Sequence, residues 1–305
     1  MVAAIKSSVP FDTQDLRGEL RYSEPMSRHT TWRVGGSADL FYLPADKEDL
    51  VALMGCVPPE MPVLWLGLGS NLLVRDRGFA GLVVKTVKGL GDLKILDNGK
   101  LYAEAGVTAA KVARRSTAAS LVGAAFLAGV PGSFGGALAM NAGAFGGETW
   151  PLVDSIECVD RQGVTHGFQR GEVEYGYRRV GLPPGMAILS AILGLKHDPE
   201  SGGKEDIREL LERRSASQPV QSANAGSVFK NPEGNYAGRV IEQLGLKAYA
   251  SGGARFSGKH ANFIVNEGTA TAADIEALIE LAMDQASSRM GIELEPEVRI
   301  VGRKT

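Results

Sequence analysis

Three dense clusters of glycine limit what this chain can fold into more than any other feature of its sequence. They lie at 67–69, 129–147 and 252–258, and apolar residues flank each of them. Such flanks favour tight turns inside folded domains over flexible linkers, which are rich in serine and proline. Because consecutive N–H groups in a glycine turn converge on anions, the first cluster is a candidate phosphate-binding loop, and the glycines of the second let the backbone approach a ligand closely.

The first cluster does not fit the Rossmann dinucleotide fingerprint. Segment 67–71 (GLGSN) lacks the third glycine, and the strand-like run 72–74 follows it where that fingerprint needs a helix. The second cluster, 128–147, is longer, and Pro131 stiffens its first turn. Taken alone, either loop is equally well explained as a packing loop between sheets. Together with the upstream TWRVGG segment (31–36), they favour a cradle for a dinucleotide.

Composition places the 305-residue chain among ordinary globular proteins of two or three compact units. Hydrophobic residues make up 44% and charged residues 22%, which is enough to bury a sizeable core. The formal net charge of −2 gives no reason to expect nucleic acid or a membrane surface as a partner. Any phosphate must therefore be bound by local hydrogen-bond donors.

Cysteine, histidine and the N-terminus exclude several other classes. Cys56 and Cys158 lie far apart without a CxxC motif, and the four histidines lack ligand spacing, so we expect reduced thiols and no metal. The N-terminus carries charges at Lys6, Asp12 and Asp15 and has no apolar stretch. No apolar run approaches the roughly 18 residues of a membrane span. These features predict a cytoplasmic protein without a signal peptide.

Hydrophobic periodicity predicts a mixture of short strands and helices, which is typical of the α+β class. The expected strands are 38–43, 63–66, 81–87, 93–96, 101–105, 155–159, 164–168, 187–195, 262–266 and 295–301. The expected helices are 47–54, 109–119, 205–213, 237–244 and 272–290. Thr271 and Asp274 form a capping-box-like start for the last helix. The polar stretch 197–204 is expected to be a domain boundary.

Seven segments occur in a fixed order from residue 29 to the C-terminus. They are RVGGSADLFYLP (33–44), GLGSNLLVRD (67–76), AGVPGSFGGALAMNAGAFGGE (128–148), YGYR (175–178), NAGSVFKNP (224–232), KHANFIVN (259–266) and LEPEVRIVG (294–302). Together they resemble the UDP-N-acetylenolpyruvoylglucosamine reductase family, also called UDP-N-acetylmuramate dehydrogenases. The spacing after Lys196 resembles the shorter branch of the family, which lacks an extra lid segment with a tyrosine.

The resemblance implies a vanillyl-alcohol-oxidase-type fold, with a two-lobed FAD-binding domain and a separate α/β substrate-binding domain. On this basis the FAD-binding unit is expected at 1–196, with lobes at about 1–88 and 89–196. The substrate-binding domain is expected at 197–305, and its last strand is a candidate to return to the first lobe. Ser37 stands where relatives of this fold carry a histidine bonded to the flavin, which implies FAD without a covalent link.

The family's reaction implies an NADPH-dependent oxidoreductase of peptidoglycan precursor synthesis. It reduces the enolpyruvyl ether of UDP-N-acetylglucosamine to UDP-N-acetylmuramate through FAD. Because an enol ether is electron-rich, hydride addition requires the developing charge to flow into the substrate carboxylate. By motif position, Arg178 would hold that carboxylate, Glu297 would contact its other side with a raised pKa, and Ser227 would donate the proton. Lys230 is a candidate to assist Ser227.

Each of the three catalytic candidates has a simpler explanation when it is taken singly. Arg178 next to Arg179 fits an exposed basic pair, and Ser227 fits a helix cap or a turn. Glu297, on a terminal strand, fits a residue that faces solvent. Only their joint occurrence in three matching motifs favours catalysis.

The resemblance also implies two sets of binding residues. The expected cofactor-binding residues are Arg33, Gly67, Leu68, Gly69, Ser70, Asn71, Leu72, Ala128, Gly129, Pro131, Gly132, Ser133, Gly135, Gly136, Asn141, Ala142 and Gly143. The expected substrate-binding residues are Tyr175, Lys230, Asn231, Arg239 and His260. His260 is equally well explained as a structural histidine, and Arg213 and Arg214 are better explained as charges on a helix surface than as phosphate ligands.

Two other functions remain open from the sequence. One is a different FAD-dependent oxidase of the same fold, which acts on a sugar or an alcohol with oxygen as acceptor. The other is a flavin-binding module without catalysis. We expect a monomer, because no apolar surface helix or heptad repeat is evident.

Overall fold

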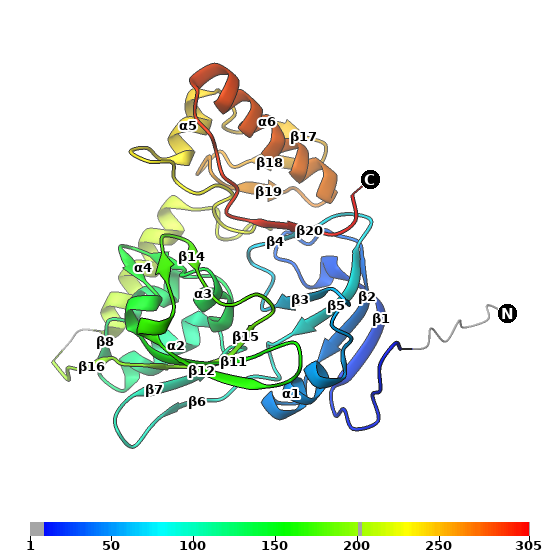
Figure 1. Cartoon of the computed structure of the whole chain (residues 1–305). Helices are drawn as coiled ribbons and strands as arrows, with labels where there is room; N and C mark the ends of the chain where they lie inside the picture. The colour runs from blue at the N-terminus through cyan, green and yellow to red at the C-terminus, as the bar shows by residue number, and fades with distance from the viewer. Residues whose placement is uncertain (1–8, 201–202, 305) are drawn as a thin grey trace.

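The computed structural model describes residues 9–200 and 203–304. Part of the predicted boundary 197–204, and Lys6 in the N-terminal argument, lie outside these residues. Three sheets of three or more strands, with their helices, follow one another along the described chain, and Figure 1 shows the third standing above the other two. None of the helices in the described part combines the length and apolar character that crossing a bilayer requires.

The first sheet has the strand order β1-β2-β5-β3. Its strands are β1 (Glu19–Pro25), β2 (Ser37–Leu43), β3 (Val63–Leu66) and β5 (Phe79–Lys85). β1 is antiparallel to β2, whereas β2, β5 and β3 are parallel neighbours. The helix α1 (Lys47–Cys56) connects β2 to β3, and Asp46 caps it by accepting a hydrogen bond from Asp49 N. The chain leaves β3 directly into the first glycine loop.

The second sheet is antiparallel, with the order β12-β11-β15-β7-β6. Its strands are β6 (Leu93–Ile95), β7 (Leu101–Glu104), β11 (Val153–Val159), β12 (Thr165–Gln169) and β15 (Ala187–Leu193). The accompanying helices are α2 (Ala109–Ala118), α3 (Phe134–Ala139) and α4 (Gly203–Ser217). Apolar side chains from these helices and strands form one buried cluster that includes Phe134 and Trp150. This packing holds the second glycine loop, which contains α3, against the sheet.

Short elements complete the second part of the chain. They are η2 (Ala125–Gly129), β9 (Gly143–Ala144), β10 (Gly147–Glu148), η3 (Trp150–Leu152), η4 (Arg170–Glu172), β13 (Tyr175–Gly176) and β14 (Arg179–Val180). β9 pairs with β10, and β13 pairs with β14, each as a small hairpin. Elsewhere, η1 (Met26–Arg28) follows β1, and β8 (Leu121–Val122) pairs with β16 (Lys196–His197). The two small hairpins carry residues of the site.

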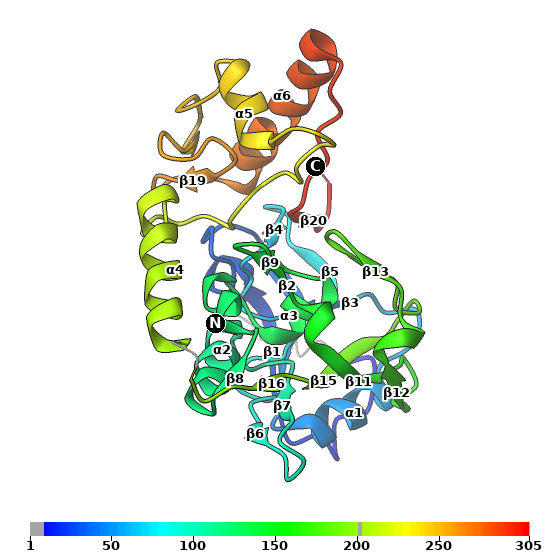
Figure 2. The ribbon, with the colours of Figure 1, turned by 90° about the vertical axis from the view of Figure 1, so that its left-hand side faces the viewer.

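The C-terminal unit packs two helices on a three-stranded sheet (Figure 2). Its elements are α5 (Ala237–Gln243), β17 (Ala250–Ser251), β18 (Ala254–Phe256), β19 (Ile264–Asn266), α6 (Ala272–Met290) and β20 (Arg299–Val301). β20 leaves this unit and pairs in parallel with β4 (Leu72–Val74), the strand after the first glycine loop. Trp32 is fully buried between the two parts, and its Nε1 donates to Ile264 O at 2.8 Å.

The expected strands and helices are present, with ends displaced by a few residues. The capping box of Thr271 and Asp274 at the start of α6 is confirmed. Several elements were not predicted, including most of the short strands and the 3-10 helices, and two of the longer ones have a clear reason. β1 carries alternating charges that hide its pairing with β2, and α3 is a short helix inside the glycine-rich segment, where glycine disfavours helix.

Candidate active site

A cavity of about 810 Å³ lies where the two lobes and the C-terminal unit meet. Its size is within the range of about 300–1,000 Å³ that is usual for small-molecule sites. Its walls come from both glycine loops, from β14 and β15, from the end of α4, and from the segments before β20. The predicted cofactor residues that line it are Gly67, Leu68, Gly69, Ser70, Asn71, Leu72, Gly129, Pro131, Gly132, Ser133, Gly135, Gly136, Ala142 and Gly143.

The two glycine loops pack directly on each other along one wall of the cavity. Ser70 Oγ donates to Pro131 O at 2.9 Å. A Cβ on Gly67 would lie 2.1 Å from Ser133 Oγ in the second loop. A Cβ on Gly69 would lie 2.0 Å from the backbone oxygen of His29, which packs on the other side of the first loop. Only glycine permits this approach, so the wall is built largely of backbone. Such a wall, with serine and asparagine donors beside it, fits the dinucleotide of FAD.

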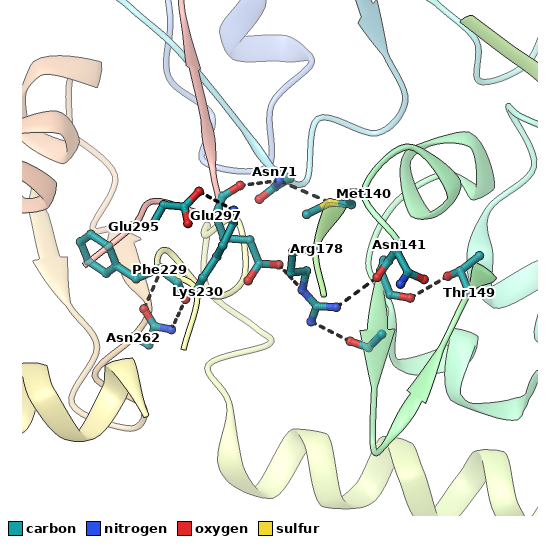
Figure 3. Close-up of polar contacts among 12 residues, drawn as sticks. Asn71, Met140, Asn141, Thr149, Arg178, Phe229, Lys230, Asn262, Glu295 and Glu297 are labelled. Atoms are coloured by element: carbon teal, nitrogen blue, oxygen red, sulfur yellow. Dashed lines mark hydrogen bonds and ion pairs between the residues drawn. The ribbon is translucent and has the colours of Figure 1, made fainter. Parts of the chain in front are cut away.

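Arg178 reaches the cavity from the turn between β13 and β14. Its backbone has φ +54°, a left-handed conformation that is unusual for a side chain of this size. The carbonyl oxygens of Asn141 and Gly143 accept hydrogen bonds from Nη1 and Nη2, at 3.3 and 3.0 Å. Nε lies 2.8 Å from Glu297 Oε1 (Figure 3). The N–H is not directed at that oxygen, so Nε is a buried donor without a hydrogen bond among the described residues.

Glu297 faces Arg178 from the segment that precedes β20 (Figure 3). Its backbone is fixed from two sides, because Asn71 Nδ2 donates to its carbonyl at 3.0 Å and its own N–H donates to Val228 O at 2.8 Å. Burial raises the pKa of the Glu297 carboxyl, although the positive charges of Arg178 and Lys230 oppose the shift. The side chain is therefore biased toward the protonated form that can donate to a carboxylate.

Ser227 lines the same cavity. The backbone of the next two residues, 228–229, forms hydrogen bonds with Asn262 and Glu297. The buried Asn262 accepts from Phe229 N at 2.9 Å and donates to Phe229 O at 2.8 Å. The backbone carbonyl of Asn262 accepts from Val228 N at 2.8 Å. Lys230 also lines the cavity, and its ammonium forms an ion pair with Glu295 (Figure 3). Arg178, Ser227 and Glu297, the three predicted catalytic residues, therefore line the same cavity, although they come from three separate parts of the chain.

Four predicted residues of the lobes lie outside the cavity lining. Arg33 is exposed in a left-handed turn, and Ala128 is buried in η2 beside the glycine loop. Asn141 is fully buried under the loop. Tyr175 stacks on Trp150, with ring centroids 5.5 Å apart. Their predicted binding roles stay predictions.

Three predicted substrate residues of the C-terminal unit also lie outside this cavity. Asn231 lines a smaller adjoining hollow of about 270 Å³ together with Lys230, and its side chain accepts a hydrogen bond at the start of α5. Arg239 is exposed on α5. His260 packs edge-on against Phe263, with ring centroids 4.9 Å apart, and burial lowers its pKa. This environment fits a structural histidine.

Arg214 was interpreted from the sequence as a surface charge, yet it lines the cavity. Its Nη1 donates to Gly129 O at 2.8 Å, its Nε donates to Gln218 at 3.0 Å, and burial lowers its pKa. The sequence contained a pattern from which the inward orientation of Arg214 could have been predicted. Ile207, Leu211 and Arg214 follow the i, i+4, i+7 spacing of one helix face, and Ile207 is the buried end of that face.

Comparison with known proteins decides the family. Residues 218–301 match the model of the C-terminal domain of UDP-N-acetylenolpyruvoylglucosamine reductase, and residues 38–168 match that of an FAD binding domain. A UDP-N-acetylenolpyruvoylglucosamine reductase of Methylococcus capsulatus is 52% identical over 286 residues, which cover 94% of each chain. This chain belongs to the UDP-N-acetylenolpyruvoylglucosamine reductase family.

Two further members of the reductase family support this assignment. The protein of Alkalilimnicola ehrlichii is 47% identical and covers 93% of this chain, with 95% of its own length matched. The crystal structure of the Thermus caldophilus reductase superposes with a TM-score of 0.79 at 32% identity, over 93% of this chain and 99% of that one. The predicted family and the α+β fold, with an FAD-binding domain and a separate C-terminal domain, are confirmed.

Proposed function

We propose that this reductase-family chain uses FAD and NADPH to reduce the enolpyruvyl ether of UDP-N-acetylglucosamine to UDP-N-acetylmuramate, in peptidoglycan precursor synthesis. The observation that carries the proposal is the contact between Arg178 and Glu297 on the wall of a cavity that glycine loops and Ser227 also line. A guanidinium, a protonated carboxyl and a hydroxyl are the groups that the reduction of a carboxylated enol ether requires.

In the proposed mechanism the two glycine loops and the Ser70 and Asn71 side chains hold FAD without a covalent bond. FAD held there would supply the hydride transfer, from NADPH to the terminal methylene carbon of the enolpyruvyl group. Arg178 binds the substrate carboxylate through its guanidinium, since Nη1 and Nη2 each carry a second N–H besides the one donated to a backbone carbonyl. Ser227 Oγ gives its proton to the carbon that bears the carboxylate.

Glu297 and Lys230 support this charge flow. With its raised pKa, Glu297 donates a hydrogen bond to the carboxylate while negative charge develops there. Lys230 follows Ser227 by three residues on the same wall, and its ammonium stabilises the serine alkoxide that proton donation leaves. Both interactions strengthen as negative charge develops, so they stabilise the transition states more than the bound substrate.

The division of the chain follows from the same proposal. Residues 1–196 form the FAD-binding unit, and 197–305 supply the substrate side, with β20 anchored on β4 of the first lobe. The chain acts as a cytoplasmic monomer and belongs to the shorter branch of the family. Tyr175, Asn231, Arg239 and His260 are its further candidate substrate contacts, and Arg33 and Ala128 are its further candidate cofactor contacts.

An anaerobic stopped-flow experiment tests the function directly. NADPH should bleach the flavin absorbance, and the enolpyruvyl nucleotide should then restore it in stoichiometric amount. A flavin that oxygen alone reoxidises at a catalytic rate, without an effect of the nucleotide, would indicate an oxidase instead. A bound flavin that NADPH does not bleach would indicate a binding module.

A further inference from the structure

Asn141 joins three segments of the second lobe through its side chain. It is fully buried. Its Nδ2 donates to Gly176 O in β13 and to Glu148 Oε2 in β10, both at 3.0 Å, and its Oδ1 accepts from Trp150 N at 3.0 Å. Both amide hydrogens and the amide oxygen are thus used inside the protein, which leaves the side chain no free donor for a ligand.

The backbone of the same residue holds Arg178. Asn141 O accepts from Arg178 Nη1 at 3.3 Å, beside the Gly143 carbonyl that accepts from Nη2. Asn141 has φ +45°, in the left-handed region that asparagine tolerates better than most residues. Because a carbonyl direction follows from the local dihedral angles, the side-chain bonds that fix this conformation also fix the acceptor for Arg178. Figure 3 shows the resulting contact between Asn141 and Arg178.

The hairpin that carries Arg178 needs such an anchor. β13 and β14 pair through two residue pairs, and the turn between them contains the left-handed Arg178. An isolated hairpin of this size is at best marginally stable in water. The Asn141–Gly176 hydrogen bond and the stacking of Tyr175 on Trp150 attach it to the lobe.

We propose that Asn141 is the positioning residue for Arg178: it holds the arginine-bearing hairpin at Gly176 and holds the guanidinium at its own carbonyl. The inference rests on the proposed reductase function, in which Arg178 binds the substrate carboxylate. It replaces direct cofactor contact as the role of the Asn141 side chain. The residue acts on the second half-reaction, in which the enolpyruvyl nucleotide reoxidises the flavin.

The Asn141→Gly variant separates the two roles, because glycine keeps the left-handed backbone accessible while it removes every side-chain bond. FAD affinity and the rate of flavin bleaching by NADPH should stay within about twofold of the parent. Flavin reoxidation by the enolpyruvyl nucleotide should slow by about tenfold or more. A fall in FAD affinity together with equal losses in both half-reactions would overturn the proposal in favour of a cofactor contact.

A double-mutant cycle with Arg178→Lys supplies the readout that a general structural role would not move. If Asn141 acts through Arg178, the double variant should reoxidise no more slowly than Arg178→Lys alone, within about twofold. Fully additive losses would overturn the proposal. Failure of the parent enzyme to be reoxidised by the nucleotide would instead reject the proposed function.

Glu148→Ala keeps the proposal testable if Asn141→Gly does not fold. This substitution removes one of the two Nδ2 acceptors and leaves the Gly176 bond in place. It should slow the same half-reaction by a smaller factor, about threefold, and should not add to Arg178→Lys. Unchanged reoxidation in this variant would count against the positioning role.

Discussion

Arg178 Nε lies 2.8 Å from Glu297 Oε1, although one residue belongs to a hairpin of the second lobe and the other to the segment of the C-terminal unit that leads into β20. Both side chains are mostly buried, with 16% and 13% of their surface exposed. The guanidinium and the carboxyl thus meet across the boundary between two parts of the chain, on the wall of one cavity. A substrate carboxylate bound there is contacted from both parts at once.

The raised pKa of Glu297 predicts a specific dependence of stability on pH. Burial makes the folded state bind this proton more tightly than the unfolded state, whose pKa is near 4.5. The stability that Glu297 contributes is therefore fully present below that value and is lost as the pH rises through the higher folded pKa. In Glu297→Gln, urea unfolding between about pH 4 and pH 8 should show a smaller decline than in the parent. Parallel curves for the two proteins would contradict the raised pKa.

Replacing Ser227 by alanine should separate the two half-reactions. Loss of a general acid lowers a rate by about 10²- to 10⁴-fold, so flavin reoxidation by the enolpyruvyl nucleotide should fall by that order. Bleaching by NADPH should be nearly unchanged, because it needs no proton from Ser227. Rapid-mixing absorbance measures both rates, and Ser217→Ala, at an exposed position on α4, is the matched control. Equal losses in both half-reactions would refute the assignment.

The contact between Gly143 and the arginine predicts that a single methyl group disturbs the site. A Cβ on Gly143 would lie 2.4 Å from Gly147 O and 3.3 Å from Arg178 Nη1. Gly143→Ala should therefore move the β9–β10 hairpin and the guanidinium, and should lower kcat/KM for the enolpyruvyl nucleotide by about 10- to 100-fold. Gly181→Ala is the control, because its Cβ would meet no atom closer than 3.4 Å. Similar effects of the two substitutions on kcat/KM would contradict the claim that a Cβ at Gly143 acts by displacing Arg178.

Much of this architecture could be predicted from the sequence because it depends on patterns among residues that are close together in the chain. Glycine density marked both loops that line the cavity, and hydrophobic periodicity marked the main helices and strands. The motifs around Arg178, Ser227 and Glu297 pointed to one site, and the three residues do line one cavity. These signals are carried by residues that are close together in the chain.

The supporting contacts could not be predicted, because they join distant segments through single hydrogen bonds. Asn71 looked like a ligand contact of a glycine loop, yet its amide also holds the Glu297 carbonyl. Asn262 looked like the start of a strand, and it fixes the backbone of Phe229. A side-chain amide has the same local signature whether it binds a ligand or a remote backbone. Arg214 differs from these amides, because its spacing from Ile207 and Leu211 on one helix face predicts that it points inward.

The junction between the first lobe and α6 predicts a measurable contribution to stability. Asp76 Oδ1 and Oδ2 accept from the backbone N–H groups of Ala272 and Ala273, in the first turn of α6. Asp76→Ala leaves both donors without this partner and removes a negative charge from the positive end of the helix. The free energy of unfolding in urea should fall by about 1–2 kcal/mol. Asp76→Asn, which retains one acceptor oxygen, should lose less, and an equal loss would exclude the capping explanation.

A partly buried histidine in the first lobe, His29, predicts acid sensitivity that is independent of the catalytic site. His29 Nε2 lies 2.8 Å from Glu24 Oε1, and Lys85 Nζ lies 3.1 Å from His29 Nδ1. Because an ammonium group can only donate, Nδ1 accepts and Nε2–H donates to Glu24, which is the arrangement of a neutral imidazole. Burial lowers the pKa of His29, and the hydrogen bond to Glu24 opposes the shift. The ring also stacks on Phe41, with centroids 4.4 Å apart.

The sign of the effect follows from this lowered pKa. The unfolded chain binds a proton near pH 6.5 and the folded chain only below it, so the stabilisation is present above 6.5 and is lost as the pH falls through the folded pKa. His29→Gln cannot titrate, and its melting temperature should therefore decline less than that of the parent between about pH 7 and pH 5. Phe41→Leu removes the stacked ring but leaves the histidine, so it should lower the melting temperature while keeping the acid slope. A His29→Gln protein with the parent's slope would show that other groups cause the acid sensitivity.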